Sequence, residues 1–275
     1  MKNSHHLPFP WPLLKYWTFR TFPMWFLIAL MIFLMQIAVC AIVHDNENVK
    51  AMLGFIDILP KFIKTALGGD YLQVGNTPGL ITIGYEHPFV LFLYMFFAVA
   101  VPTGLLTGEV QKGTMELILS RQATKLHVYI CAGLITVTGM FALVMIMFLG
   151  TVVAVHIYDF GKPIPLDMFF RIAIDGGVFA STVGAIALFC AAIFNTRNIA
   201  TGIAVTFLVV NYFISIISQW WPRMSFLKGA TLFGYVGGPK IVTAWPVPDM
   251  CVLAVIFLLT IFSGAITWNH RDLPL

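Results

Sequence analysis

Charged residues are scarce in this sequence. Only 10% of the 275 residues are Asp, Glu, Lys or Arg, whereas a soluble globular domain carries roughly 25%. Hydrophobic residues make up 59%, which is more apolar surface than one protein core can bury. The composition therefore excludes an ordinary water-soluble fold, because lipid is needed to solvate much of the surface. We expect a multi-pass membrane protein.

Cysteine and recognisable catalytic motifs are also scarce. The four cysteines fall in four different apolar segments, so neither a disulfide framework nor a zinc site is predicted. The chain has no GxxxxGK[ST] phosphate loop, no HExxH and no GxSxG motif, so we predict no enzyme activity, metal or cofactor of its own. The net charge of +4 is dispersed and does not indicate a nucleic-acid partner.

Long apolar segments are what the sequence has in place of these features. Six of them approach or exceed the roughly 20 residues that a helix needs to cross the hydrocarbon layer. Their Leu, Ala, Met and Phe content favours helices over the alternating strands of a membrane barrel. We predict an all-α membrane protein whose single domain, residues 1–275, has spans at 24–43, 88–107, 128–155, 168–194, 199–221 and 250–268.

Six spans place both termini on one side of the membrane, and the loops indicate which side this is. Lys and Arg are denser in the loops that share a side with the termini than in the opposite loops. The positive-inside rule then predicts that both termini are cytoplasmic. We expect the membrane to be the plasma membrane.

Three segments outside the spans are predicted to be helical as well. Residues 10–22 combine Trp and Leu with Lys15 and Arg20, a pattern typical of an interfacial helix in the headgroup layer. Residues 51–67 have a polar stripe opposite an apolar one and predict a second surface helix. Residues 223–248 are partly apolar and broken by Gly and Pro, which favours short re-entrant helices before the sixth span.

The connection after the second span is the only cytoplasmic loop of any length. Four of its polar residues recur at helical spacing and predict one polar stripe: Glu109, Lys112, Glu116 and Ser120. The aliphatic residues Val110, Leu117 and Ile118 are expected to lie away from that stripe. A solvated turn between spans is the simplest alternative interpretation.

A bend is expected inside this loop. Gly113 interrupts the helical pattern, Thr114 is placed to cap a new helix, and Glu116 lies in its first turn, where the helix dipole favours a carboxylate. We therefore predict a bent pair of short helices that projects into the cytoplasm.

The loop sequence resembles a signature of the permease subunits of the ABC-2 family of ABC transporters. In that signature an acidic residue is followed by Gly-Thr, a second Glu, aliphatic residues, Ser or Thr, and a Pro-Val-Ser-Arg-like tail. Gln122 replaces the usual Pro here, and Lys125 stands for Arg. The matching residues are Glu109, Gly113, Thr114, Glu116, Leu117, Leu119 and Ser120.

The resemblance implies a permease subunit of an ATP-binding cassette exporter, in a bacterial inner membrane. The bent loop would be a coupling helix in a cleft of a separate ATPase subunit, present in two copies, which binds ATP and magnesium. A second permease, identical or related, would complete the pathway. The residues expected to contact the ATPase are Glu109, Lys112, Gly113, Thr114, Glu116, Leu117, Ser120 and Arg121.

Four polar residues inside the apolar segments are further candidates. Arg171 and Asp175 are one helical turn apart and can form a pair, either as a structural pair near the interface or in substrate binding. Gln36 and Asn211 are amides in hydrocarbon, where hydrogen bonding between helices is their ordinary use.

Two other functions remain open at this point. An intramembrane enzyme would need paired acid and base residues, a nucleophile or metal ligands within the spans. An ion-coupled carrier would need charges along a pathway beyond Arg171 and Asp175.

Overall fold

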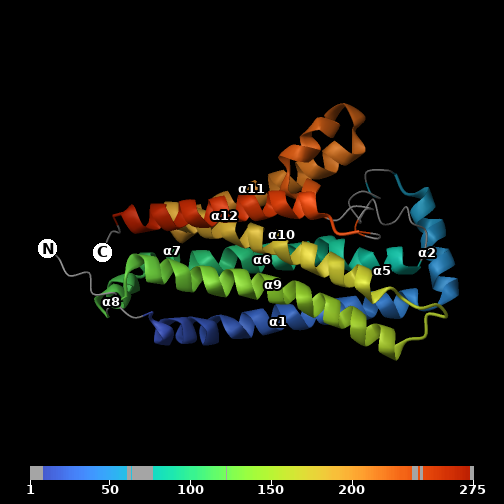
Figure 1. Cartoon of the computed structure of the whole chain (residues 1–275), viewed down its shortest axis with the longest axis horizontal. Coiled ribbons are helices and arrows are strands. Elements are labelled where there is room, and N and C mark those ends of the chain that lie inside the picture. Colours follow the sequence, from blue (N-terminus) through green and yellow to red (C-terminus); the bar gives the residue numbers. More distant parts are fainter. Residues whose placement is uncertain are drawn as a thin grey trace.

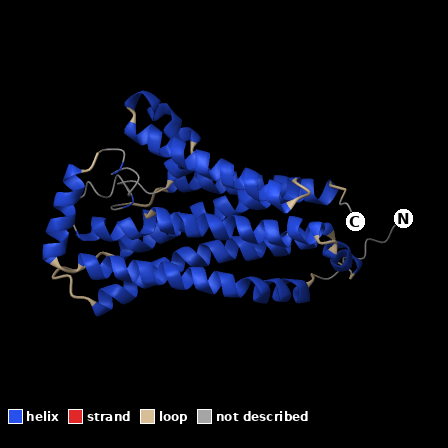
Figure 2. Cartoon of the chain, turned by 180° about the vertical axis from the view of Figure 1, so that it is seen from behind, coloured by secondary structure: helices blue, strands red, loops and turns tan. Residues whose placement is uncertain are grey.

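The computed structural model describes residues 9–60, 63, 77–121, 123–236, 241 and 244–272. Within these ranges every regular element is helical (Figure 2). Six helical segments are long and apolar enough to cross a membrane: Trp11–Val43, Thr77–Leu105, Lys125–Ile157, Leu166–Ile193, Arg197–Trp220 and Val247–His270. The prediction of an all-helical, multi-pass membrane protein is therefore confirmed.

The spanning helices lie side by side, and shorter helices lie at the two ends of the bundle (Figure 1). The order is α1 (Trp11–Val43), α2 (Asn46–Ile58), α5 (Thr77–Glu86), α6 (Pro88–Leu105), α7 (Thr107–Gln111), α8 (Thr114–Ser120), α9 (Lys125–Ile157), α10 (Leu166–Ile193), α11 (Arg197–Trp220), the 3₁₀ helices η1 (Pro222–Ala230) and η2 (Leu232–Tyr235), and α12 (Val247–His270).

Helix α1 joins two segments that the sequence separates. The predicted interfacial helix at 10–22 and the first span form one continuous helix of 33 residues, which passes through Pro23. At 1.5 Å per residue its length is about 50 Å, more than the ~30 Å of the hydrocarbon layer. Trp17 is fully buried, so the first turns pack against the bundle. Their interfacial position stays a prediction.

The second span begins earlier than the apolar pattern indicates. Helix α5 precedes α6 and is largely buried, although its residues lie outside the predicted second span at 88–107. His87 separates the two helices with an extended backbone, because the residue before a proline is disfavoured in the helical region. Its Nδ1 accepts a hydrogen bond of 3.2 Å from the Phe89 backbone N–H, which caps α6.

The predicted surface helix at 51–67 and the broken segment at 223–248 are each described only in part. Helix α2 begins at Asn46 and ends at Ile58, two residues before Pro60, and most of 61–67 lies outside the described residues. The broken segment contains η1 and η2, and residues 237–240 and 242–243 are likewise not described. Its re-entrant character stays a prediction.

Helix α10 is the centre of the bundle. In its most apolar stretch 78% of the residues are buried, compared with 11% in α12. Small residues permit this close packing. A side chain at Gly177 would meet the Phe141 ring at 2.7 Å, and one at Gly184 would meet Thr136 at 3.0 Å. These glycines therefore let α9 and α10 approach, as small residues do between membrane helices.

One threonine joins three helices inside the bundle. The Thr151 Oγ1 on α9 accepts a 2.9 Å hydrogen bond from Gln36 Nε2 on α1 and lies 2.7 Å from the Tyr85 hydroxyl on α5. Gly84 makes room for the Gln36 amide, because a Cβ at Gly84 would overlap its Oε1. Gln36 thus acts in helix packing, the use expected of an amide in hydrocarbon.

Replacing Thr151 with Val keeps the side-chain shape and removes the shared hydrogen-bond partner. We expect a loss of about 1–3 kcal/mol in stability, since two buried polar side chains lose a partner together. Thr138→Val is the matched control, because Thr138 lies on the same helix and is exposed. Thermal unfolding in detergent measures the effect, and equal midpoints for the two variants would contradict this role of Thr151.

Candidate functional site

The α7–α8 pair has a bend at Gly113. Gly113 adopts a φ of 72° and precedes the first residue of α8, and this left-handed region suits glycine because a Cβ would be strained there. Thr114 is not the cap that the sequence suggested. It is the first residue of α8, and its hydroxyl instead lies 2.5 Å from the Glu109 Oε2.

Glu109 lies inside the protein at 5% exposure. Its Oε1 pairs with Arg20 Nη1 on α1 at 2.5 Å, while its Oε2 accepts a hydrogen bond from Thr114. The prediction that Glu109 shares one polar stripe with Lys112, Glu116 and Ser120 is therefore wrong, because those three residues are exposed. The stripe continues one helical spacing across Gly113, whereas α7 has five residues and the chain turns at Lys112 and Gly113 before α8 begins.

The remaining predicted residues form an exposed surface on the bend and on α8. Leu117 is 66% exposed and lies among the polar residues, contrary to its expected place away from them. Met115 is fully buried and holds α8 against the bundle. We use the term α8 surface for Lys112, Gly113, Glu116, Leu117, Ser120 and Arg121, all of which are exposed.

The α7–α8 pair lies at the end of the bundle where the described chain begins and ends (Figure 1). Phe9 contacts the His127 ring near the start of α9, with 6.0 Å between ring centroids. Lys125 Nζ, at the first residue of α9, donates a 2.6 Å hydrogen bond to the Arg271 carbonyl oxygen. The loop and both ends of the described chain are thus on one side of the six spans, which we call the α8 end.

Helix α7 also contacts the start of α11. The Arg197 backbone N–H donates a 3.2 Å hydrogen bond to Gln111 Oε1. Its side chain runs along α6 and α7, where Nη2 and Cδ each lie 3.7 Å from the positions that Cβ atoms at Gly104 and Gly108 would occupy. Sequence reasoning missed Gln111, because nothing in its spacing indicates a partner 86 residues away.

The polar residues within the spans lie close to side-chain or backbone atoms with which they can pair. Arg171 forms a salt bridge of 3.2 Å with Asp167, one turn earlier, and its Nε donates to the Ile241 carbonyl oxygen. Asp175 is buried, and its pairing with Arg171 stays a prediction. Asn211 Oδ1 on α11 accepts a 2.9 Å hydrogen bond from the Leu232 backbone N–H at the start of η2.

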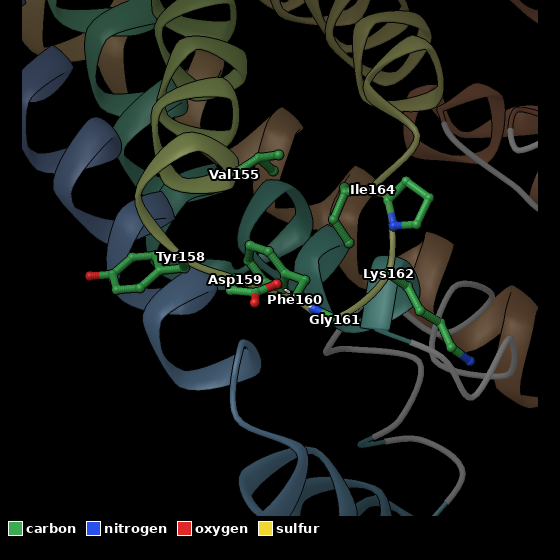
Figure 3. A pocket seen from close by; sticks show the side chains of 8 residues that line it. Val155, Tyr158, Asp159, Phe160, Gly161, Lys162 and Ile164 are labelled. Carbon is green, nitrogen blue, oxygen red and sulfur yellow. Dashed lines mark hydrogen bonds between the residues drawn. The ribbon is translucent and has the colours of Figure 1, made fainter.

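A cavity of about 350 Å³ lies at the other end, in the loop between α9 and α10 (Figure 3). The end of α9 and the loop that follows it line the cavity. The Tyr158 and Lys162 side chains point away from each other. Its two charged residues, Asp159 and Lys162, are both exposed. No group of three potential metal ligands occurs among the described residues. The cavity therefore offers no convergent chemistry.

Comparisons of this chain with protein-family models and with curated proteins give no match.

The buried Glu109 should hold α7 and α8 in place. We expect Glu109→Ala to increase trypsin cleavage after Lys112 and Arg121 by about 5- to 30-fold, because a partly buried ion pair and a hydrogen bond are lost while Arg20 remains partly solvated. Limited proteolysis of the purified protein measures this rate.

Glu116→Ala is the control for this prediction, since Glu116 is exposed on α8 itself. Its cleavage rate should stay within about two-fold of the wild-type rate. If Glu109→Ala and Glu116→Ala were cleaved equally fast, the Glu109 pair would not be what orders the loop.

Proposed function

We propose that this chain is the permease subunit of an ABC-2 type ATP-binding cassette exporter and forms half of a membrane pathway. The observation that carries the proposal is the α7–α8 pair. It combines the residues of the signature, a glycine bend and an exposed surface with a buried attachment to the spans. In this role the α8 surface docks into a cleft of a separate ATPase subunit.

The attachment of α7 supports a mechanical role. Glu109 ties the pair to α1, and Gln111 ties it to the start of α11. Helix α6 runs into α7 through a single residue, Leu106. A force applied to α8 would consequently reach three spans, whereas a solvated turn without such contacts would absorb it.

The composition of the α8 surface supports protein binding. It places the exposed Leu117 between charged residues of both signs, and an apolar group within a polar rim is a common arrangement at interfaces. The expected occupant is an ABC ATPase, two copies of which bind ATP and magnesium and drive the exporter. The sequence itself has no phosphate loop.

The proposal also specifies a second membrane subunit, the membrane and the orientation of the chain in it. A second permease, identical or related, completes the pathway, because one bundle of six helices does not enclose a two-sided route. The α8 end then faces the cytoplasm of a bacterial cell, and the spans cross the inner membrane. The dense Lys and Arg content of the loops at this end supports that orientation.

Reversing the charge of Glu116 tests the docking. We expect Glu116→Arg to reduce co-purification of the ATPase in mild detergent at least ten-fold, because like charges facing each other across an interface cost several kcal/mol. The bound ATPase is quantified by its ATP hydrolysis per permease.

Glu47→Arg provides the matched control, since it makes the same charge change at an exposed residue of α2, at the opposite end of the bundle. This variant should retain the ATPase fully. Equal retention by both variants, or no associated ATPase in the wild-type preparation, would rule out the proposed docking.

A further inference from the structure

The short turn between α10 and α11 receives a contact from the far end of the chain. Arg271, which follows α12, donates a 2.8 Å hydrogen bond from Nη1 to the Ala192 carbonyl oxygen at the end of α10. Its Nη2 donates to the Asn195 Oδ1 in the turn. Two donors of one guanidinium thus engage the turn in a fixed geometry.

Arg271 is itself held in place by its neighbours. Its carbonyl oxygen accepts a hydrogen bond from Lys125 Nζ at the start of α9, and its guanidinium lies 5.5 Å from the Trp268 ring centroid. The Trp268 Nε1 donates a 2.9 Å hydrogen bond to the Lys125 carbonyl oxygen. Burial lowers the pKa of Arg271 below its ordinary value, yet a guanidinium stays protonated at neutral pH.

The start of α11, directly after this turn, contacts α7. Arg197, two residues after Asn195, is bonded to Gln111 on α7 and lies along Gly104 and Gly108. A continuous path of contacts therefore runs from α7 through the turn to the end of α12.

This path connects the two spans whose most apolar stretches have the smallest buried share. In the most apolar stretches of α11 and α12 only 28% and 11% of the residues are buried. Leu253, Gly264 and Trp268 are the buried residues of α12. Helix α12 packs chiefly along α10, and the polar contacts at the α8 end connect it to α7 through the turn.

We infer that the turn at residues 194–196 is a junction that passes displacement of α7–α8 to α12. Asn195 and Arg271 are the positioning residues of this junction, which extends the proposed function by a second route besides the Glu109 pair on α1. When the ATPase moves α8, the end of α12 moves with it.

The experiment follows the distance between α8 and α12 in the complex with its ATPase. Spin labels are placed at Leu119→Cys, a half-buried α8 residue outside the α8 surface, and at His270→Cys, which is exposed. The exposed native cysteine is removed by Cys251→Ser, while the other three cysteines are buried. Distance distributions are recorded without nucleotide and with ATP and vanadate.

Wild type is expected to keep one narrow distance in both states. Asn195→Leu should broaden the distribution at least two-fold and make it depend on nucleotide, while the amount of bound ATPase stays unchanged because the α8 surface is intact. Asn195→Asp retains the acceptor oxygen and should restore the narrow distance. Asn198→Leu, at an exposed neighbour in the same segment, should behave as wild type.

Two results would overturn the inference. A narrow, nucleotide-independent distance in Asn195→Leu would show that Asn195 does not link α12 to α8, and the proposed function would stand. Absence of an ATPase from the wild-type complex would overturn the proposed function, and the role of the junction with it.

Discussion

The attachment of the α7–α8 pair depends on one buried carboxylate. Glu109 is placed between Arg20 of α1 and Thr114 of α8, and both of its oxygens are used. A buried carboxylate without such partners would be costly. The carboxylate thus fixes the short helix α7 relative to α1, and α7 in turn determines where α8 presents its exposed residues. The position of the α8 surface is therefore fixed by Glu109, which is buried and is not one of the exposed residues of that surface.

The bundle is packed unevenly around this end. Helix α10 is enclosed and small residues bring α9 close to it, while α11 and α12 remain largely exposed. In a membrane such exposed apolar surface is covered by lipid or by another protein. Under the proposed function, the enclosed helices supply the rigid part of the subunit. Helices α11 and α12, which have large exposed faces and are joined to α7 through the turn at 194–196, supply the part that can move.

The sequence predicted the features that depend on local patterns. The apolar segments located all six spans, since each is long enough to be recognised without knowledge of its neighbours. Gly113 indicated the bend, because an interruption of helical spacing by glycine is itself a local signal. Helix α5 escaped recognition, since its ten residues include two glycines and a proline and it is separated from α6 by the extended His87.

Contacts between distant residues could not be predicted in this way. Glu109 fits the spacing of an exposed stripe, and only its partner 89 residues away shows that it is buried. Arg171 has an acidic residue one turn away on either side, and the spacing that predicts a pair with Asp175 does not reveal the salt bridge with Asp167. The hydrogen bonds of Arg271 with the α10–α11 turn likewise follow from the fold and from no motif.

Site-specific photo-crosslinking from α8 tests the central claim most directly. A photoreactive residue at Leu117 in the intact membrane is predicted to capture an ATP-binding cassette ATPase, identified by mass spectrometry. The same residue at Phe55, which is 59% exposed on α2 at the opposite end, is predicted to capture none. If the residue at Leu117 captured only lipid or proteins that do not bind nucleotide, the account of α8 as the docking element would be contradicted.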